Sequence, residues 1–154
     1  MPRHLRTGSG GNAMIYTWEH KIQYYETDQM RIAHHSNYIR WFEEARTFAL
    51  EQAGFGYGKM EECGVMSPVV GVSAEYKMMS RFPETLLIET RMKLYNGVRM
   101  VISYVVKEKE TGEVRCVGES SHCFIDSRTY QLISLKRTHP EIHEVVRAMV
   151  DSGS

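Results

Sequence analysis

One short segment combines the residue types that could carry chemistry. It runs from Tyr24 to Arg46 and reads YYETDQMRIAHHSNYIRWFEEAR. An acidic residue, Asp28, lies there in a predicted loop, ahead of a helix that is expected to open at the Asn37-Tyr38 pair. Backbone N–H groups at a helix start lack intrahelical partners, and the helix dipole favours negative charge there. A loop carboxylate at such a place could act as a base beside an electropositive helix end, although an isolated aspartate is more often a surface or capping residue.

Other polar residues of the segment allow ordinary explanations. His34 and His35 could suggest a metal, but adjacent histidines point in different directions and no cysteine or carboxylate completes a ligand set. We therefore predict no metal site. Ser36 or Asn37 could cap the helix, and for Asn37 this is compatible with a contact in the site.

Two glutamates on the predicted helix also need a decision. Glu44 can pair with Arg40 and Glu43 with Arg46, at the three- and four-residue spacing that brings side chains together on a helix. This spacing favours a solvated helix face.

Composition and missing motifs exclude several classes of protein. The chain has 154 residues with a formal net charge of zero, which gives no general basic footprint for nucleic acid. No apolar run approaches the ~20 residues that cross a bilayer. Three cysteines without CxxC spacing favour neither a disulfide framework nor a zinc knuckle and suggest the cytoplasm. No GxSxG, P-loop or GxGxxG motif supports a serine hydrolase, an NTPase or a dinucleotide enzyme.

The elements that must position the segment follow a simple order. A strand is expected from Met14 to about Tyr25 and a long helix from about Ser36 to Ala53, which Gly54 closes. The helix carries a wide apolar face made of Tyr38, Trp41, Phe42, Ala45, Phe48 and Ala49. After a glycine-rich connection, strands are expected at 65–79, 85–95, 98–109, 114–126 and 130–135, and a short helix at 140–150. One antiparallel sheet that curls around the long helix would cover its apolar face, so the predicted fold class is α+β.

The first thirteen residues differ from the rest. MPRHLRTGSGGNA offers almost nothing to bury, and we interpret residues 1–13 as a disordered tail or a cloning remnant, with Met14 as the functional start. The predicted domain covers residues 14–150. Further along, the methionines Met78, Met79, Met92 and Met100 are expected to fill the core, although Met also suits an adaptable acyl pocket.

The segment resembles the signature of the 4-hydroxybenzoyl-CoA thioesterase branch of the hotdog superfamily. That signature places an Asp after a strand end, then an Asn-Tyr pair about nine residues later, then an aromatic-rich helix. The residues that fall on it without a gap are Asp28, His35, Asn37, Tyr38 and Glu44-Ala45-Arg46. The later stretches that resemble family strands run from Pro68 through Tyr76 to Phe82 and from Gly118 to Asp126.

The resemblance implies a fold and an activity. The fold would be a hotdog, an antiparallel sheet wrapped around one long central helix. The activity would be hydrolysis of an acyl-CoA-type thioester, with Asp28 as general base or nucleophile and backbone N–H groups at the helix N-terminus polarising the carbonyl. His35, Asn37 and Tyr38 would belong to the substrate pocket.

The resemblance also implies partners. Lys77, Arg81 and Arg99 are candidates for the phosphates of CoA. No separate cofactor is expected, because CoA is part of the substrate, and the acyl carrier could be CoA or acyl carrier protein. Exposed sheet edges favour a homodimer or homotetramer.

One departure and two alternatives remain. Arg31 stands where members of the family commonly have Gly, which leaves the acyl specificity and the oxyanion geometry open. A dehydratase-type hotdog enzyme would need a His and an acid across the groove, a pair that the sequence does not make evident. A non-catalytic acyl-CoA-binding module would usually carry a DNA-binding segment, and no helix-turn-helix pattern is evident.

Overall fold

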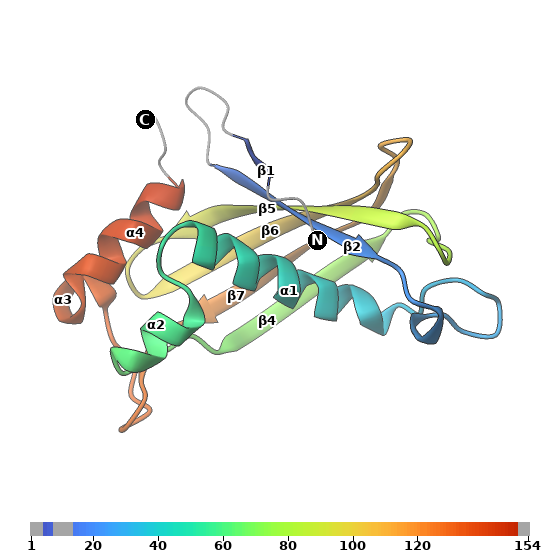
Figure 1. Cartoon of the computed structure of the whole chain (residues 1–154). Coiled ribbons are helices and arrows are strands. Elements are labelled where there is room, and N and C mark those ends of the chain that lie inside the picture. The colour runs from blue at the N-terminus through green and yellow to red at the C-terminus, as the bar shows by residue number, and fades with distance from the viewer. Residues whose placement is uncertain (1–4, 8–13, 151–154) are drawn as a thin grey trace.

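The computed structural model describes residues 5–7 and 14–150. Its main body is a six-stranded antiparallel sheet in the order β1-β2-β5-β6-β7-β4, and α1 crosses one face of it (Figure 1). The sheet strands are β1 (Leu5–Thr7), β2 (Ile15–Lys21), β4 (Val69–Tyr76), β5 (Thr85–Tyr95), β6 (Arg99–Glu108) and β7 (Val114–Cys123). The other elements are η1 (Tyr24–Glu26), α1 (Ser36–Gln52), α2 (Tyr57–Glu62), α3 (Leu135–Thr138), α4 (Pro140–Val150) and the paired short strands β3 (Val65–Met66) and β8 (Ile125–Asp126).

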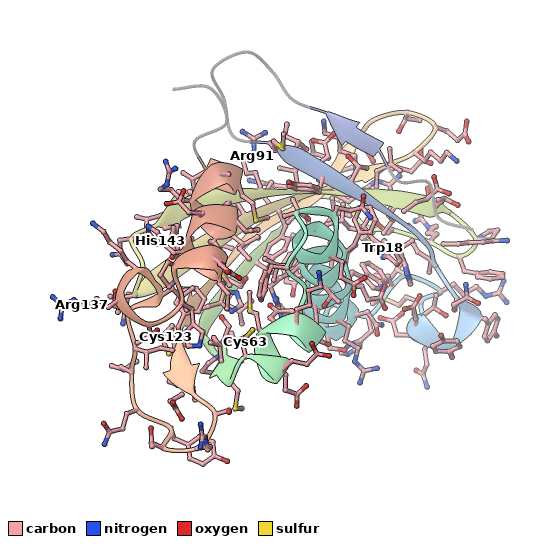
Figure 2. All side chains as sticks on the ribbon, turned by 60° about the vertical axis from the view of Figure 1, so that its left-hand side comes forward. Trp18, Cys63, Arg91, Cys123, Arg137 and His143 are labelled. Carbon is pink, nitrogen blue, oxygen red and sulfur yellow. The ribbon has the colours of Figure 1, made fainter. Side chains whose placement is uncertain are left out.

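The long helix forms because its apolar side chains share one face. All six residues that the sequence assigned to that face are buried in the core. Full burial of each large side chain stabilises the fold by roughly 1.5–3 kcal/mol. Phe42 stacks on Tyr104 of β6 with ring centroids 4.3 Å apart. On β2, Trp18 reaches α1 and packs against Phe48 (Figure 2).

Most predicted elements are confirmed. The strand at 85–95 and the helix at 140–150 have the expected bounds, and α1 ends at Gln52 before Gly54, whose φ is +102°. The first predicted strand ends early, at Lys21, because η1 turns the chain. The predicted connection after α1 contains a further helix, α2.

The predicted strand at 130–135 is wrong. Only an isolated bridge joins Leu132 to Ile125, and α3 begins at Leu135. The carboxylate of Asp126 accepts the N–H groups of Arg128 and Thr129 at 2.8 and 3.0 Å. This local turn competes with an extended ladder, so the chain bends back instead of adding a strand.

The predicted tail lies mostly outside the described residues. Within it the structure describes Leu5–Thr7, which form β1 and pair with the edge of β2. The three cysteines are unpaired, and Cys116 and Cys123 are buried.

Candidate active site

The connection between β2 and α1 folds back on itself at one end of the sheet, away from α3 and α4 (Figure 1). Thr27 and Ala33 form an antiparallel bridge that closes a turn around Asp28. The N–H of Ala33 donates to the carbonyl of Ser80 at 2.7 Å. The turn is therefore attached to the segment that links β4 to β5.

A pocket of about 400 Å³ opens beside this turn. Three of the four predicted site residues, Asp28, His35 and Tyr38, line it together with the predicted cation Lys77. The remaining lining residues are Met30, Ile32, Ala33, Tyr76, Met78 and Met79. One carboxylate, one cation and a largely apolar wall thus meet in one place.

Asp28 is held by its own turn. Its Oδ1 accepts the N–H of Met30 at 2.8 Å, and its carbonyl accepts the N–H of Arg31 at 2.9 Å. Arg31 has a φ of +65°, in the left-handed region that favours glycine. Arg31 therefore adopts the kind of backbone that a glycine would permit at this position, and the turn keeps its shape.

The start of α1 differs from the prediction. The N-cap is His35, not Ser36 or Asn37, and no side chain of the cap bonds the helix. Asn37 lies inside the first turn, where its Nδ2 donates to the carbonyl of Glu26 at 2.8 Å. Asn37 consequently ties the helix to the loop from behind and is not a lining residue of the pocket.

His35 offers a backbone donor at the pocket. Among the described residues, no hydrogen bond is formed by its N–H. The N–H of Ser36 donates to His34 Nδ1, and those of Asn37 and Tyr38 donate to the carbonyls of His34 and His35. The His35 carbonyl accepts the hydroxyl of Tyr76 at 3.1 Å. An N–H at a helix start, next to a carboxylate in the same pocket, can polarise a carbonyl.

Two tyrosines build the wall opposite the turn. Tyr38 donates to Ser80 Oγ at 3.0 Å, and its ring meets Tyr76 edge-on at 5.2 Å. Burial raises the pKa of both tyrosine hydroxyls, which keeps them protonated at neutral pH. Arg115 reaches Ser80 Oγ at 3.2 Å and the Glu84 carboxylate at 2.9 Å, so this wall has a fixed support.

The three cationic residues predicted to bind the phosphates of CoA do not lie together in the structure. Lys77 lines the pocket, although its Nζ also contacts Glu75 at 2.6 Å. Arg81 pairs with Ile32 beside the turn but does not line the pocket. Arg99 starts β6 at the opposite end of the sheet, roughly 30 Å away by the rise of about 3.3 Å per residue along β5. Within one chain, Arg99 therefore lies too far from the pocket to contact a ligand there.

The expected surface pairs on α1 are partly wrong. Glu44 does not pair with Arg40; it accepts Trp18 Nε1 at 3.1 Å and lies 3.4 Å from His20 Nδ1. Glu43 does approach Arg46, at 4.0 Å, but Arg46 is buried and donates to the hydroxyls of Tyr57 and Tyr104. Arg46 is buried because it donates hydrogen bonds to tyrosine hydroxyls on neighbouring elements. These elements lie far apart in the sequence.

Sequence reasoning missed several lining residues. Met78 and Met79 were expected in the core, whereas both are exposed and line the pocket; Met92 and Met100 are buried as expected. Tyr76 and Ser80 carried no signal, because their roles depend on how β4 returns to the Asp28 turn. An exposed Met-Met pair just after a strand is the only feature that could have pointed to a pocket wall.

Neither a cluster of metal ligands nor a membrane-spanning helix is found in the part of the chain that the structure describes. Within 5–7 and 14–150, no group of three or more His, Cys, Asp or Glu side chains is arranged to hold a metal ion. In that same part of the chain, no helix has the length and apolar character needed to cross a membrane.

Comparison with known proteins identifies the family. The sequence pattern of the thioesterase-like superfamily matches residues 22–149. A Bacillus subtilis protein named "Putative acyl-CoA thioesterase YneP" is 36% identical over 125 residues, which cover 81% of this chain and 90% of that protein. The acyl-CoA thioester hydrolase YbgC of Escherichia coli O157:H7 is 24% identical over 64% of this chain and 74% of its own length.

Comparison with solved structures supports the same family. The DHNA-CoA thioesterase of Staphylococcus aureus is 33% identical and superposes with a TM-score of 0.81 over 86% of this chain and 89% of its own. A hypothetical protein from Aquifex aeolicus is 28% identical with a TM-score of 0.76 over 84% of this chain and 98% of its own. With one helix crossing a curved antiparallel sheet and the family pattern spanning nearly all of it, the chain belongs to the thioesterase-like superfamily and has the hotdog fold.

Proposed function

We propose that this protein hydrolyses acyl-CoA thioesters to a free acid and CoA thiol, with Asp28 as general base or nucleophile. The single observation that carries the proposal is the shared pocket of Asp28 and His35. The carboxylate can take a proton from water or attack the thioester carbon. The free N–H of His35 lies at the helix start, where it can stabilise the oxyanion that develops on the carbonyl.

The pocket wall supports an acyl substrate. Methionine side chains and tyrosine rings supply an apolar, adaptable surface for an acyl or aromatic group. The resemblance to proteins named acyl-CoA thioesterase YneP and DHNA-CoA thioesterase points to the same class of reaction. Within the pocket we assign His35 and Tyr38 to the substrate wall and Asn37 to the support of the helix start.

The proposal also includes the carrier of the acyl group and the location of the protein in the cell. Lys77 at the pocket, and Arg81 beside it, would attract the phosphates of CoA or of the phosphopantetheine on an acyl carrier protein. Arg99 could meet such a group only from another copy of the chain. Hydrolysis would use water and these groups without a resident cofactor. Three unpaired cysteines are compatible with the proposed location, the cytoplasm.

We also propose a homodimer, or a tetramer built from dimers. Among the described residues, β4 pairs only with β7 and forms one edge of the sheet. Its residues Val69, Val70 and Val72 expose about half of their surface. An apolar strand edge of this kind favours pairing with a second copy.

The test is a panel of acyl-CoAs that differ in chain length and aromaticity, including DHNA-CoA, with thiol release as the readout. We expect turnover of at least one thioester by the wild type and a fall of kcat by about 10²–10⁴ for Asp28→Asn. Binding of these compounds without release of thiol would favour a non-catalytic acyl-CoA-binding module instead.

One observation favours a second candidate. The sequence did not make a His and acid pair evident, yet His35 and Asp28 line one pocket. A dehydratase-type reaction would remove water from a 3-hydroxyacyl-CoA and leave the thioester intact. Formation of the conjugated enoyl-CoA, without thiol release, would establish that reaction in place of hydrolysis.

A further inference from the structure

Close to the candidate site but outside the pocket lining lies a buried carboxylate, that of Glu26. It ends η1, two residues before Asp28, and exposes only 7% of its surface. Carboxylates are seldom buried so fully unless hydrogen bonds satisfy both oxygens. Here each oxygen has a partner from a different element.

The contacts of the carboxylate connect three parts of the fold. Oε1 accepts the N–H of Gln23 at 2.8 Å and lies 2.9 Å from His20 Nε2 on β2. Oε2 accepts Trp41 Nε1 on α1 at 2.9 Å. The side chain thus joins the strand before the loop to the helix after it.

The backbone of the same residue holds the other end of the loop. The Glu26 carbonyl accepts the N–H of His34 at 2.9 Å and Nδ2 of Asn37 at 2.8 Å. His34 directly precedes His35, which lines the pocket. Between these two fixed ends the chain makes only the short turn that carries Asp28.

We propose that Glu26 is a positioning residue, whose buried carboxylate fixes the backbone that presents both Asp28 and the His35 N–H to the substrate. This inference rests on the function proposed above. Glu26 does not line the pocket, so it acts through those two groups and not on the substrate. Displacement of a reacting group by about 1 Å can cost on the order of 10² in rate.

The variant Glu26→Gln tests the proposal, because both oxygens face N–H donors. An amide must turn its NH₂ toward one of these donors, so at least one contact is lost. We expect kcat to fall by roughly 10–100-fold with KM within about threefold of wild type. In an Asp28→Asn background the same change should cost less than in wild type, since only the His35 N–H is then left to position.

The matched control is Glu108→Gln. Glu108 is 5% exposed and also accepts backbone N–H groups, those of Glu110 and Thr111 in the β6–β7 turn, and it is not a lining residue of the pocket. Its kcat should stay near that of wild type. If Glu26→Gln does not fold, Trp41→Phe removes the donor to Oε2 together with part of a buried ring, and it should lower kcat in the same direction.

Amide hydrogen exchange provides a readout that does not need activity. In Glu26→Gln, the amides of Asp28 and His34 should exchange faster than in wild type, while in Glu108→Gln they should not. A wild type that releases no thiol would refute the proposed function, and the exchange rates would still decide about Glu26. Unchanged exchange, a kcat within threefold of wild type, or a loss that simply adds to that of Asp28→Asn would overturn the positioning role.

Discussion

At the scale of single residues, the site depends on a few atoms with defined partners. His20 lies between two carboxylates, 2.9 Å from Glu26 and 3.4 Å from Glu44. Burial alone would lower its pKa, but hydrogen bonds to Glu44 and Glu26 outweigh this effect and raise the pKa above its ordinary value. Protonated His20 therefore stabilises the folded state.

This gives a pH dependence with a definite sign. A raised folded-state pKa contributes stability that is fully present below the unfolded value of about 6.5 and is lost as pH rises through the folded value. The free energy of unfolding that His20→Gln costs should thus be larger at about pH 5.5 than at about pH 9. Urea unfolding of both proteins at the two pH values measures this, and a cost that grows toward high pH would contradict it.

Arg31 allows a second residue-scale prediction. A non-glycine residue in the left-handed region is strained by about 1–2 kcal/mol, while glycine costs about 0.5–1 kcal/mol more in unfolded-chain entropy. Arg31→Gly should leave the free energy of unfolding unchanged or raise it by up to about 1.5 kcal/mol, whereas Arg31→Val should lower it. Thermal unfolding compares the two, and a marked loss of stability in Arg31→Gly would show that the arginine side chain supports the turn.

At the scale of elements, α1 approaches the sheet closely at one point. A Cβ added to Gly118 of β7 would lie 2.5 Å from the Ser73 carbonyl oxygen and 2.6 Å from the Phe42 ring. No side chain fits between the helix and the strands at this position. The absence of a Cβ at Gly118 is what permits the contact between Phe42 and the sheet.

Gly118→Ala should therefore destabilise the fold by about 1–3 kcal/mol, the usual cost of overpacking. Gly58→Ala is the control, because nothing lies within 4 Å of its added Cβ and alanine favours the helix α2 by up to about 1 kcal/mol. Chemical denaturation should give opposite signs for the two variants. Equal effects would mean that the helix can shift without cost.

The sequence predicted those parts of the fold that depend on local pattern. Apolar residues alternate along 85–95 and recur at three- and four-residue spacing along α1. Each of these patterns reflects a single element that packs against one apolar surface. The prediction from sequence pattern was less successful where contacts between distant segments determine the structure. The burial of Arg46 by tyrosines of α2 and β6 and the pocket wall after β4 both depend on tertiary contacts. The strand predicted at 130–135 was wrong for a different reason, the local turn at Asp126.

The site was predictable to a similar extent. Asp28, His35 and Tyr38 lie within one short segment, so their spacing alone brings them together. Asn37 does not cap the helix, because His35 occupies the N-cap position. The Asn37 side chain donates instead to the Glu26 carbonyl in the loop. Glu26 gave no signal in the sequence, since its partners lie on β2 and α1 and are recognisable only in the folded chain.

At the scale of the whole molecule, one sheet edge is open and apolar. The proposed pairing through β4 predicts that a charge at Val70 separates the copies, since lysine on an edge strand opposes strand addition. Light scattering of wild type should give a mass of two or more chains, and Val70→Lys should lower it. Leu132→Lys, at an exposed apolar residue in the turn after β8, is the control and should leave the mass unchanged. A monomeric wild type at micromolar concentration would refute the pairing.

The proposed hydrolysis depends most directly on the carboxylate of Asp28. Asp28→Asn removes the charge and the proton acceptor but keeps the volume of the side chain, so folding should survive. We predict that kcat for thiol release falls by about 10²–10⁴ with little change in KM, while Glu44→Gln, which alters only the partner of Trp18 and His20, costs far less. Near-normal turnover of Asp28→Asn together with loss of turnover in Glu44→Gln would contradict this account and assign catalysis to the helix glutamate.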